Sequence, residues 1–109
     1  MAVVSEHVIA MVTAPLQEAE SLSRAIVEAK LAACVHVLQA GRSTYWWEGK
    51  IEEADEQTLI IKTRQTAIGG LRELLDEKHP YDVYELVVLA VTDGNPAYLS
   101  WITDSVAAS

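Results

Sequence analysis

The sequence predicts a single α+β domain in which two helices cover one face of an antiparallel sheet and a third helix follows the last strand. The chain has 109 residues, which suits one compact domain of ordinary size, so 1–109 is expected to be one domain. Two separated segments carry apolar residues at the spacing of a helix. Short apolar runs rich in β-branched residues precede, separate and follow those segments, as the strands of one sheet would.

The N-terminal part is expected to form a strand and then a helix. Residues 8–12 read Val-Ile-Ala-Met-Val, an apolar run that Pro15 soon ends, and this is typical of a buried strand. Over 16–30, apolar side chains recur every three or four residues. This spacing predicts a helix whose buried stripe begins at Leu16.

The middle of the chain is expected to form a hairpin. Residues 33–38 and 42–47 have β character, and Gly41 between them is expected to break or kink the strand. The sequence Glu-Gly-Lys at 48–50 is typical of a tight turn, after which 51–64 forms the returning strand.

The C-terminal part is expected to add a second helix, a strand and a short third helix. An apolar stripe predicts the second helix over 66–78, and Pro80 ends it because the residue before a proline disfavours the helical conformation. The segment 84–92 is rich in Val and Leu and is expected to be the last strand. In the turn 93–96, Asn as N-cap and Pro at the first helical position predict a helix over 97–103.

The resulting order, β-α-β-β-α-β plus a final helix, predicts a ferredoxin-like domain. Right-handed crossovers place both helices on one face of the sheet and leave the other face open. Trp46 and Trp47 are neighbours in a strand and point to opposite faces, so one is expected under the helices and the other on the open face. Half of the residues are hydrophobic. A domain of this length buries a smaller fraction of its surface than a larger one, so some of this apolar surface is expected to stay exposed in a single chain. We therefore expect other subunits to cover the open face.

Composition excludes several classes of partner. Eight Lys and Arg against sixteen Asp and Glu give a formal net charge of −8, so neither nucleic acid nor an anionic membrane surface is expected as a partner. The longest apolar run, 86–91, is far too short for a membrane span. The single cysteine, Cys34, excludes an intrachain disulfide. A free thiol and an N-terminus without the basic start of a signal peptide lead us to expect a cytoplasmic protein.

The motifs of the common enzyme classes are missing from the sequence. Its five glycines form neither a GxGxxG nor a phosphate-binding loop, and no GxSxG or HExxH can be written. No nucleophile stands beside a base in a known pattern. We therefore expect a protein without catalytic activity.

Cys34 and His36 are the first candidate site. One residue separates them in a predicted strand, so both side chains point to the same face, about 7 Å apart along the backbone. A thiolate and an imidazole together suit Cu or Zn. The alternative is that Cys34 is a small buried hydrophobe, as free cysteines usually are.

The second candidate site is His79-Pro80-Tyr81-Asp82, followed by Glu85. Pro80 sets the chain direction where helix gives way to strand, and the loop could hold His79, Asp82 and Glu85 near one another. An imidazole and carboxylates could bind a divalent ion or a polar small molecule. The alternative is that His79 hydrogen-bonds the C-terminus of the helix, where a cation is also favoured.

Lys62 is the third candidate, because it stands inside an apolar strand. Its ammonium group could offer a charge to an anionic ligand in a cleft. The alternative is that its aliphatic stem passes along the core and carries the charge to water.

Five motifs together resemble one known family. They stand in order along the chain as Leu31-Ala32-Ala33-Cys34-Val35, Tyr45-Trp46-Trp47-Glu48-Gly49-Lys50-Ile51, Ile60-Ile61-Lys62-Thr63, His79-Pro80-Tyr81 and Gly94-Asn95-Pro96-Ala97-Tyr98-Leu99. The chain thereby resembles the divalent-cation tolerance family, CutA, from about residue 7 to residue 105. The resemblance implies a ferredoxin-like fold similar to that of the PII signalling proteins, and a homotrimer whose three sheets face one another around the axis. It also implies a link to tolerance of copper or other divalent metals, without a firm enzymatic activity.

Two motif positions carry over residue by residue. The cysteine of the family's Leu-Ala-Ala-Cys motif falls on Cys34, and the His-Pro-Tyr-Glu motif falls on 79–82, where Asp82 replaces Glu and shortens the reach by one methylene. Other cysteines that help to bind copper in some members are absent, so a metal here would depend on His36, His79 and carboxylates.

The leading hypothesis is therefore a homotrimeric metal-binding or metal-sensing module for Cu²⁺ or another divalent cation. Its metal ligands would be Cys34, His36 and His79. Its ligand cleft, between subunits, would contain Trp47, Lys62, Tyr81, Asp82 and Glu85. A second hypothesis is a PII-like module that binds a nucleotide or another small anion through Lys62, and a third is an assembly protein whose cleft is incidental.

Overall fold

The structure is a computed structural model that describes residues 6–107. Residues 1–5 and 108–109 lie outside the described residues. The expectation that the N-terminus carries no signal peptide therefore falls partly on residues that are not described. The elements follow one another as β1 (His7–Pro15), α1 (Ala19–Glu28), β2 (Cys34–Val37), β3 (Gly41–Trp47), β4 (Lys50–Arg64), η1 (Gln65–Ala67), α2 (Ile68–Lys78), β5 (Val87–Ala90) and α3 (Pro96–Ser105).

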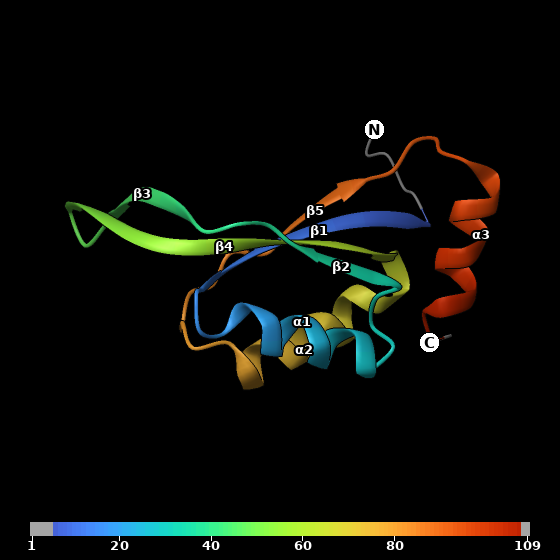
Figure 1. Ribbon diagram of the computed structural model, residues 1–109, viewed down its shortest axis with the longest axis horizontal. Helices are drawn as coiled ribbons and strands as arrows, with labels where there is room; N and C mark the ends of the chain where they lie inside the picture. Colours follow the sequence, from blue (N-terminus) through green and yellow to red (C-terminus); the bar gives the residue numbers. More distant parts are fainter. Residues whose placement is uncertain (1–5, 108–109) are drawn as a thin grey trace.

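The strands form one antiparallel sheet in the order β2-β4-β1-β5, and β3 pairs with the N-terminal half of β4. Helices α1 and α2 lie on one face of the sheet, and α3 stands at its end (Figure 1). The predicted α+β, ferredoxin-like fold with a C-terminal helix is confirmed. Among the described helices, none is long and apolar enough to cross a membrane.

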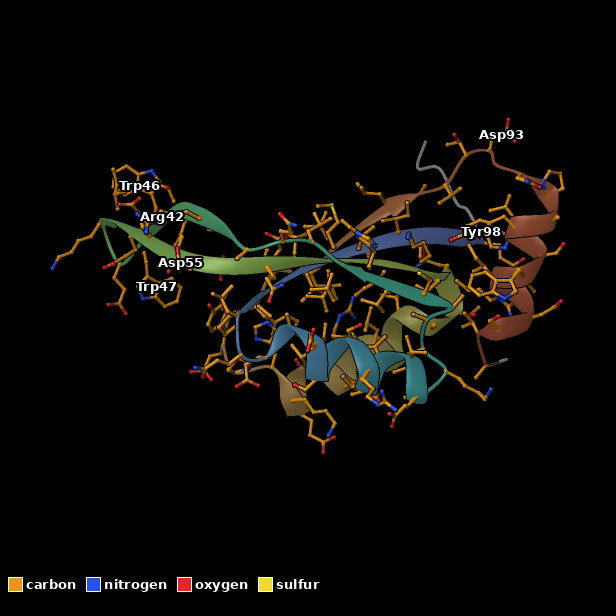
Figure 2. The ribbon with its side chains drawn as sticks, in the orientation of Figure 1. Arg42, Trp46, Trp47, Asp55, Asp93 and Tyr98 are labelled. Atoms are coloured by element: carbon orange, nitrogen blue, oxygen red, sulfur yellow. The ribbon has the colours of Figure 1, made fainter. Side chains whose placement is uncertain are left out.

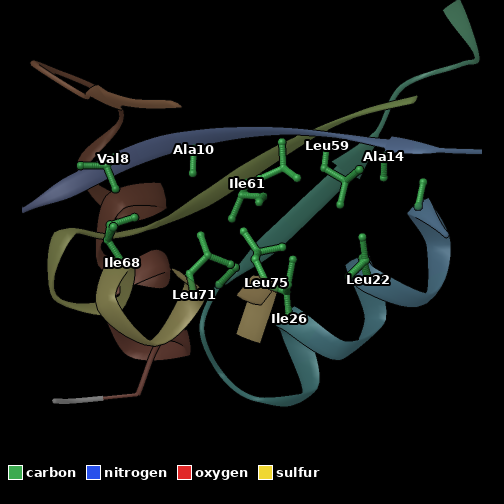
Figure 3. Close-up of a cluster of buried hydrophobic side chains, with 13 residues drawn as sticks. Val8, Ala10, Ala14, Leu22, Ile26, Leu59, Ile61, Ile68, Leu71 and Leu75 are labelled. Atoms are coloured by element: carbon green, nitrogen blue, oxygen red, sulfur yellow. The ribbon is translucent and has the colours of Figure 1, made fainter. Parts of the chain in front are cut away.

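The core lies between the sheet and the two helices (Figure 3). Along β1, buried and half-buried residues alternate, because successive side chains of a strand point to opposite faces. Leu59 and Ile61 of β4 face the same core, and Ile26 of α1 and Leu71 of α2 cover them from the helical side. The apolar stripes that predict the helices are thus the surfaces that the sheet buries.

The first helix begins later than the spacing predicts. β1 continues to Pro15, whose carbonyl accepts a hydrogen bond of 2.9 Å from the N–H of Glu18, so the chain turns before α1 begins. Leu16 lies in this turn with 45% of its surface exposed, and the prediction that it begins the buried stripe is wrong. The helix ends at Glu28, since Lys30 adopts the left-handed conformation with φ of 58°.

β3 and the N-terminal half of β4 form a two-stranded arm that extends beyond the sheet and the helices (Figure 1). Its turn has positive φ at both central residues, 50° at Glu48 and 78° at Gly49. This is the turn type that suits the right-handed twist of a two-residue hairpin, and glycine adopts its second position without strain. The predicted tight turn is confirmed.

Trp46 and Trp47 point to opposite sides of the arm (Figure 2). The predicted opposite orientation is confirmed, but both side chains are exposed, to 72% for Trp46 and 47% for Trp47. The expectation that one of them lies under the helices is wrong, because the arm carries both beyond the reach of α1 and α2.

The last strand is shorter than the apolar run that predicts it. The expected strand over 84–92 is reduced to β5, because Tyr84 turns toward α2 and its hydroxyl donates a hydrogen bond of 2.6 Å to the carboxylate of Asp76. β5 pairs with β1 along one edge only. Its other edge has no strand partner within residues 6–107.

The sheet face opposite the helices, here called the open face, is largely apolar. Ile9 lies beside Leu89, and Met11 lies beside Ile60, in the registers of β1 with β5 and β4. Leu89 is exposed, and no helix of the described chain lies over this face (Figure 1).

Candidate functional site

A cleft of about 630 Å³ lies between the arm and the loop that follows α2. We call it the arm cleft. Its lining residues are Thr13, Ser43, Thr44, Tyr45, Trp47, Glu56, Tyr81, Asp82, Val83 and Glu85. Four of the five residues predicted for the ligand cleft are among them. Lys62 is not, because it lies beside Cys34 of β2, six residues farther along β4 than Glu56.

The arm supplies one wall of the cleft through alternate residues of β3. Ser43, Tyr45 and Trp47 are two residues apart and therefore share one side of the strand. The opposite wall comes from Tyr81 and the residues after it, which Pro80 directs away from the end of α2.

Tyr81 connects the two walls. Its hydroxyl donates a hydrogen bond of 2.8 Å to Oε2 of Glu56 on β4. Burial raises the pKa of Tyr81 to about 12, and the hydrogen bond and negative charge of Glu56 add to the shift. The phenol therefore stays protonated, and keeps donating to Glu56, over the whole neutral range.

This raised pKa predicts a loss of stability at alkaline pH. Because folded Tyr81 holds its proton more firmly than an ordinary phenol of pKa 10.0, the free energy of unfolding falls as pH rises from 10.0 toward 12 and is unaffected below that window. Denaturant titrations across this range should show a smaller fall for Tyr81→Phe than for the wild type. Part of the fall remains in the variant, since the hydrogen bond to Asp76 also raises the pKa of Tyr84. Equal falls in both proteins would contradict the assignment.

His79 is held by hydrogen bonds at both ring nitrogens. Nε2 lies 2.8 Å from the carbonyl oxygen of Thr13, to which it donates, and Nδ1 accepts a bond of 3.0 Å from the N–H of Tyr81. The ring is only 8% exposed and stacks on Tyr84, with 5.2 Å between ring centroids. The hydrogen bond to the end of α2 is made by its backbone N–H to Leu75, and not by its side chain.

Cys34, His36 and Lys62 lie on the open face, away from His79. Cys34 is paired with Lys62 across β2 and β4, and Nζ of Lys62 lies 3.8 Å from Sγ. Val35 and Val37, which alternate with Cys34 and His36 along β2, pack against the core. This confirms that Cys34 and His36 share the opposite face of the strand.

The three predicted metal ligands therefore do not meet within one chain. Among residues 6–107, no group of three or more His, Cys, Asp or Glu side chains is arranged to hold a metal ion. Cys34 and His36 have the donor types that copper and zinc prefer, but they are two ligands, and His79 would have to break both of its hydrogen bonds to join them.

Sequence reasoning misses two important residues of the arm cleft. Tyr45 could have been found, because it precedes Trp47 by two residues in a strand and must share its side. Glu56 carries no local signal, since its partner Tyr81 is distant in the chain and only the fold brings them together.

Comparison with known proteins places the chain in a family. The CutA1 divalent ion tolerance protein family matches residues 8–105. Protein CutA homolog of Xenopus laevis is 46% identical over 88 residues, which cover 81% of this chain and 58% of that protein. The divalent-cation tolerance protein CutA of Thermus thermophilus is 37% identical over 98 residues, which cover 89% and 95%. The chain thus spans little more than half the length of the animal and plant relatives that it matches.

Solved structures agree with this assignment. CutA1 from Oryza sativa superposes with a TM-score of 0.93 at 38% identity, covering 96% of this chain and 97% of that one. The divalent cation tolerance protein of Thermus thermophilus superposes with a TM-score of 0.90 at 34% identity, covering 93% and 99%. This chain belongs to the CutA1 divalent ion tolerance protein family.

Proposed function

We propose that this protein is a divalent-cation tolerance protein that acts as a homotrimer, binds Cu²⁺ or a similar divalent ion, and catalyses no reaction. The observation that carries the proposal is the open face, which presents Cys34 and His36 beside uncovered apolar residues in a member of this family.

The apolar open face supports the homotrimer. Leu89 and Val87 are exposed there although β-branched and aliphatic side chains are stabilised by burial. A closed three-fold assembly gives every chain the same contacts and could cover the open face of each. The resemblance to CutA is the reason to propose three subunits, and the uncovered apolar face is the surface through which we expect them to meet.

Assembly around this face also supports metal binding. Each chain contributes a thiol and an imidazole from one face of β2, and this pair is too small a ligand set alone. Three copies of the face around one axis would bring further pairs toward it. The formal charge of −8 per chain attracts all cations diffusely, so only selective, saturable binding supports the proposal.

A role without catalysis, in the cytoplasm, completes the proposal. The nearest charged neighbour of Cys34 is the ammonium group of Lys62, which cannot act as a base while protonated, and both nitrogens of His79 are engaged. The free thiol of Cys34 suits a reducing compartment. The names of relatives indicate other compartments: one from Arabidopsis thaliana is named chloroplastic, and one from Archaeoglobus fulgidus is named periplasmic.

The arm cleft does not favour the second hypothesis, a nucleotide or another small anion. Its lining contains the carboxylates of Glu56, Asp82 and Glu85 and, among the residues that the structure describes, no Lys or Arg. The nearest expected cation, Lys62, lies on the open face. Negative charge in a cleft repels phosphate.

Calorimetric titration of metal-free protein with Cu²⁺ tests the proposal. We expect saturable binding, weakened about ten-fold or more in Cys34→Ser/His36→Gln, since even changes outside the ligand set commonly weaken metal sites by that factor. Glu53→Gln, which removes one charge on the arm, is the matched control and should bind like the wild type. Mg²⁺ controls for diffuse attraction. Sedimentation velocity of the same samples should show a trimer.

Two outcomes would overturn the proposal. A monomer at micromolar concentration would reject the homotrimer. Cu²⁺ binding that is no tighter than Mg²⁺ binding, or that survives in the double variant, would reject metal binding through Cys34 and His36.

A further inference from the structure

We propose that Asp93 is a site of spontaneous covalent modification, at which its carboxyl group condenses with the N–H of Gly94 and the resulting succinimide ring opens to isoaspartate. The site lies in the loop 91–95, between the end of β5 and the start of α3 (Figure 2). This loop lies beyond the strands that form the open face. The reaction joins atoms of two adjacent residues, so neither a metal ion nor a second chain takes part in it.

The side chain of Asp93 is folded back onto the backbone that follows it. Its Oδ1 accepts a hydrogen bond of 2.8 Å from the N–H of Gly94, and both residues are exposed. Because Cγ is bonded to Oδ1, Cγ lies within about 4 Å of the same nitrogen. Groups that are already held close together react faster than separate ones, so this contact favours closure of the ring.

The reaction needs water and no other reactant. The nitrogen of Gly94 forms a bond to Cγ of Asp93 and gives its proton to the hydroxyl group of the carboxyl, which leaves as water. A water molecule then opens the ring at one of its two carbonyl groups. Opening at Cγ restores aspartate, and opening at the main-chain carbonyl leaves isoaspartate, whose backbone passes through Cβ and Cγ. Nothing is oxidised or reduced.

Glycine at the next position distinguishes Asp93 from the other aspartates. The chain has five aspartates, and Asp93 alone is followed by glycine, which has no Cβ to hinder its nitrogen or restrict the backbone. The other four are Asp55, Asp76, Asp82 and Asp104. Three of these lie in a regular strand or helix, whose backbone hydrogen bonds hold the conformation, and the fourth precedes the β-branched Val83.

The product would alter the start of α3. The side chain of Asn95 caps this helix by accepting a hydrogen bond of 3.0 Å from the N–H of Ala97. Isoaspartate adds one methylene to the backbone two residues before Asn95 and so displaces the cap. Asn95, the only asparagine, does not undergo the same reaction, because Pro96 has no N–H.

Incubation of the assembled wild-type protein for several weeks at neutral pH tests the proposal. Cleavage by a protease that cuts before aspartate but not before isoaspartate, followed by mass spectrometry, measures the converted fraction at each of the five positions. A methyltransferase that labels isoaspartyl carboxyl groups gives an independent measure. Circular dichroism shows that the protein stays folded throughout. We expect conversion at Asp93 and none above background at the other four aspartates.

Two variants assign the reaction to this loop. In Gly94→Ala the new Cβ would lie 3.4 Å from the side chain of Leu99, an ordinary contact, so the variant should fold like the wild type. The methyl group restricts the backbone and hinders the nitrogen, so conversion at Asp93 should slow about three-fold or more. Gly69→Ala, which has open space around its new Cβ, is the matched control and should convert like the wild type.

The proposal fails in three cases. Equal conversion at Asp82 or Asp104 would show general ageing of the chain instead of a site at Asp93. No conversion at Asp93 in the folded protein would show that the loop prevents the ring from closing. An equal rate in Gly94→Ala and Gly69→Ala would show that the nitrogen of Gly94 does not control the reaction.

Discussion

Leu71→Ala is expected to lower the free energy of unfolding by about 3–4 kcal/mol. Leu71 of α2 has no exposed surface and belongs to the cluster of apolar side chains between the helices and the sheet (Figure 3). Removing most of its side chain takes apolar surface out of the core and leaves a cavity that the surrounding strands and helices fill only in part. Urea denaturation at one fixed protein concentration measures the change, because the proposed assembly would add stability that depends on concentration.

Leu16→Ala is the matched control for this prediction. The same side chain is removed, but Leu16 lies in the turn before α1 and is largely exposed, so a change of about 0.5 kcal/mol or less is expected. Similar losses in the two variants would show that the helical stripe does extend to Leu16 and that the observed start of α1 is wrong.

His79→Ala is expected to lower the free energy of unfolding by about 3 kcal/mol. The substitution leaves the carbonyl of Thr13 and the N–H of Tyr81 without their partners and removes the ring stacked on Tyr84. Because Thr13 is in β1 and Tyr81 follows α2, the ring holds the loop against the sheet. The arm cleft should therefore lose its shape together with stability.

A metal-ligand role for His79 would give a different result. Glu77→Ala, an exposed change at the same end of α2, is the control for stability and is expected to alter it by about 0.5 kcal/mol or less. If His79→Ala instead keeps its stability and binds Cu²⁺ ten-fold more weakly, His79 is a ligand and its hydrogen bonds are secondary.

The fold could be predicted from local patterns because its core is periodic. The alternation along β1 and the apolar stripes of α1 and α2 are repeated over many residues, so a mistake at one position does not change the element. The wrong predictions concern the first residues of two elements: Leu16, which lies before α1, and Tyr84, which lies before β5. Both side chains could continue the apolar pattern. The turn of the backbone after Pro15 keeps Leu16 out of α1, and the hydrogen bond from Tyr84 to Asp76 keeps Tyr84 out of β5.

The candidate site could be predicted only in part. Trp47, Tyr81, Asp82 and Glu85 were identifiable as polar or aromatic groups in a strand and a loop, and the fold brings them to one cleft. Lys62 was expected with them because its place in an apolar strand is unusual. The register of β4 with β2 puts it beside Cys34 instead, six residues farther along β4 than Glu56 of the cleft.

The sequence by itself determined the order of the elements, the tight turn at Gly49, the shared face of Cys34 and His36, and the family. These follow from spacing within a few residues, or from motifs read in order. Only the tertiary structure decided that the arm projects beyond the helices, that Tyr81 meets Glu56, and that both nitrogens of His79 are occupied. Such contacts join residues far apart in the chain, and their free energies depend on how the elements pack rather than on any local pattern.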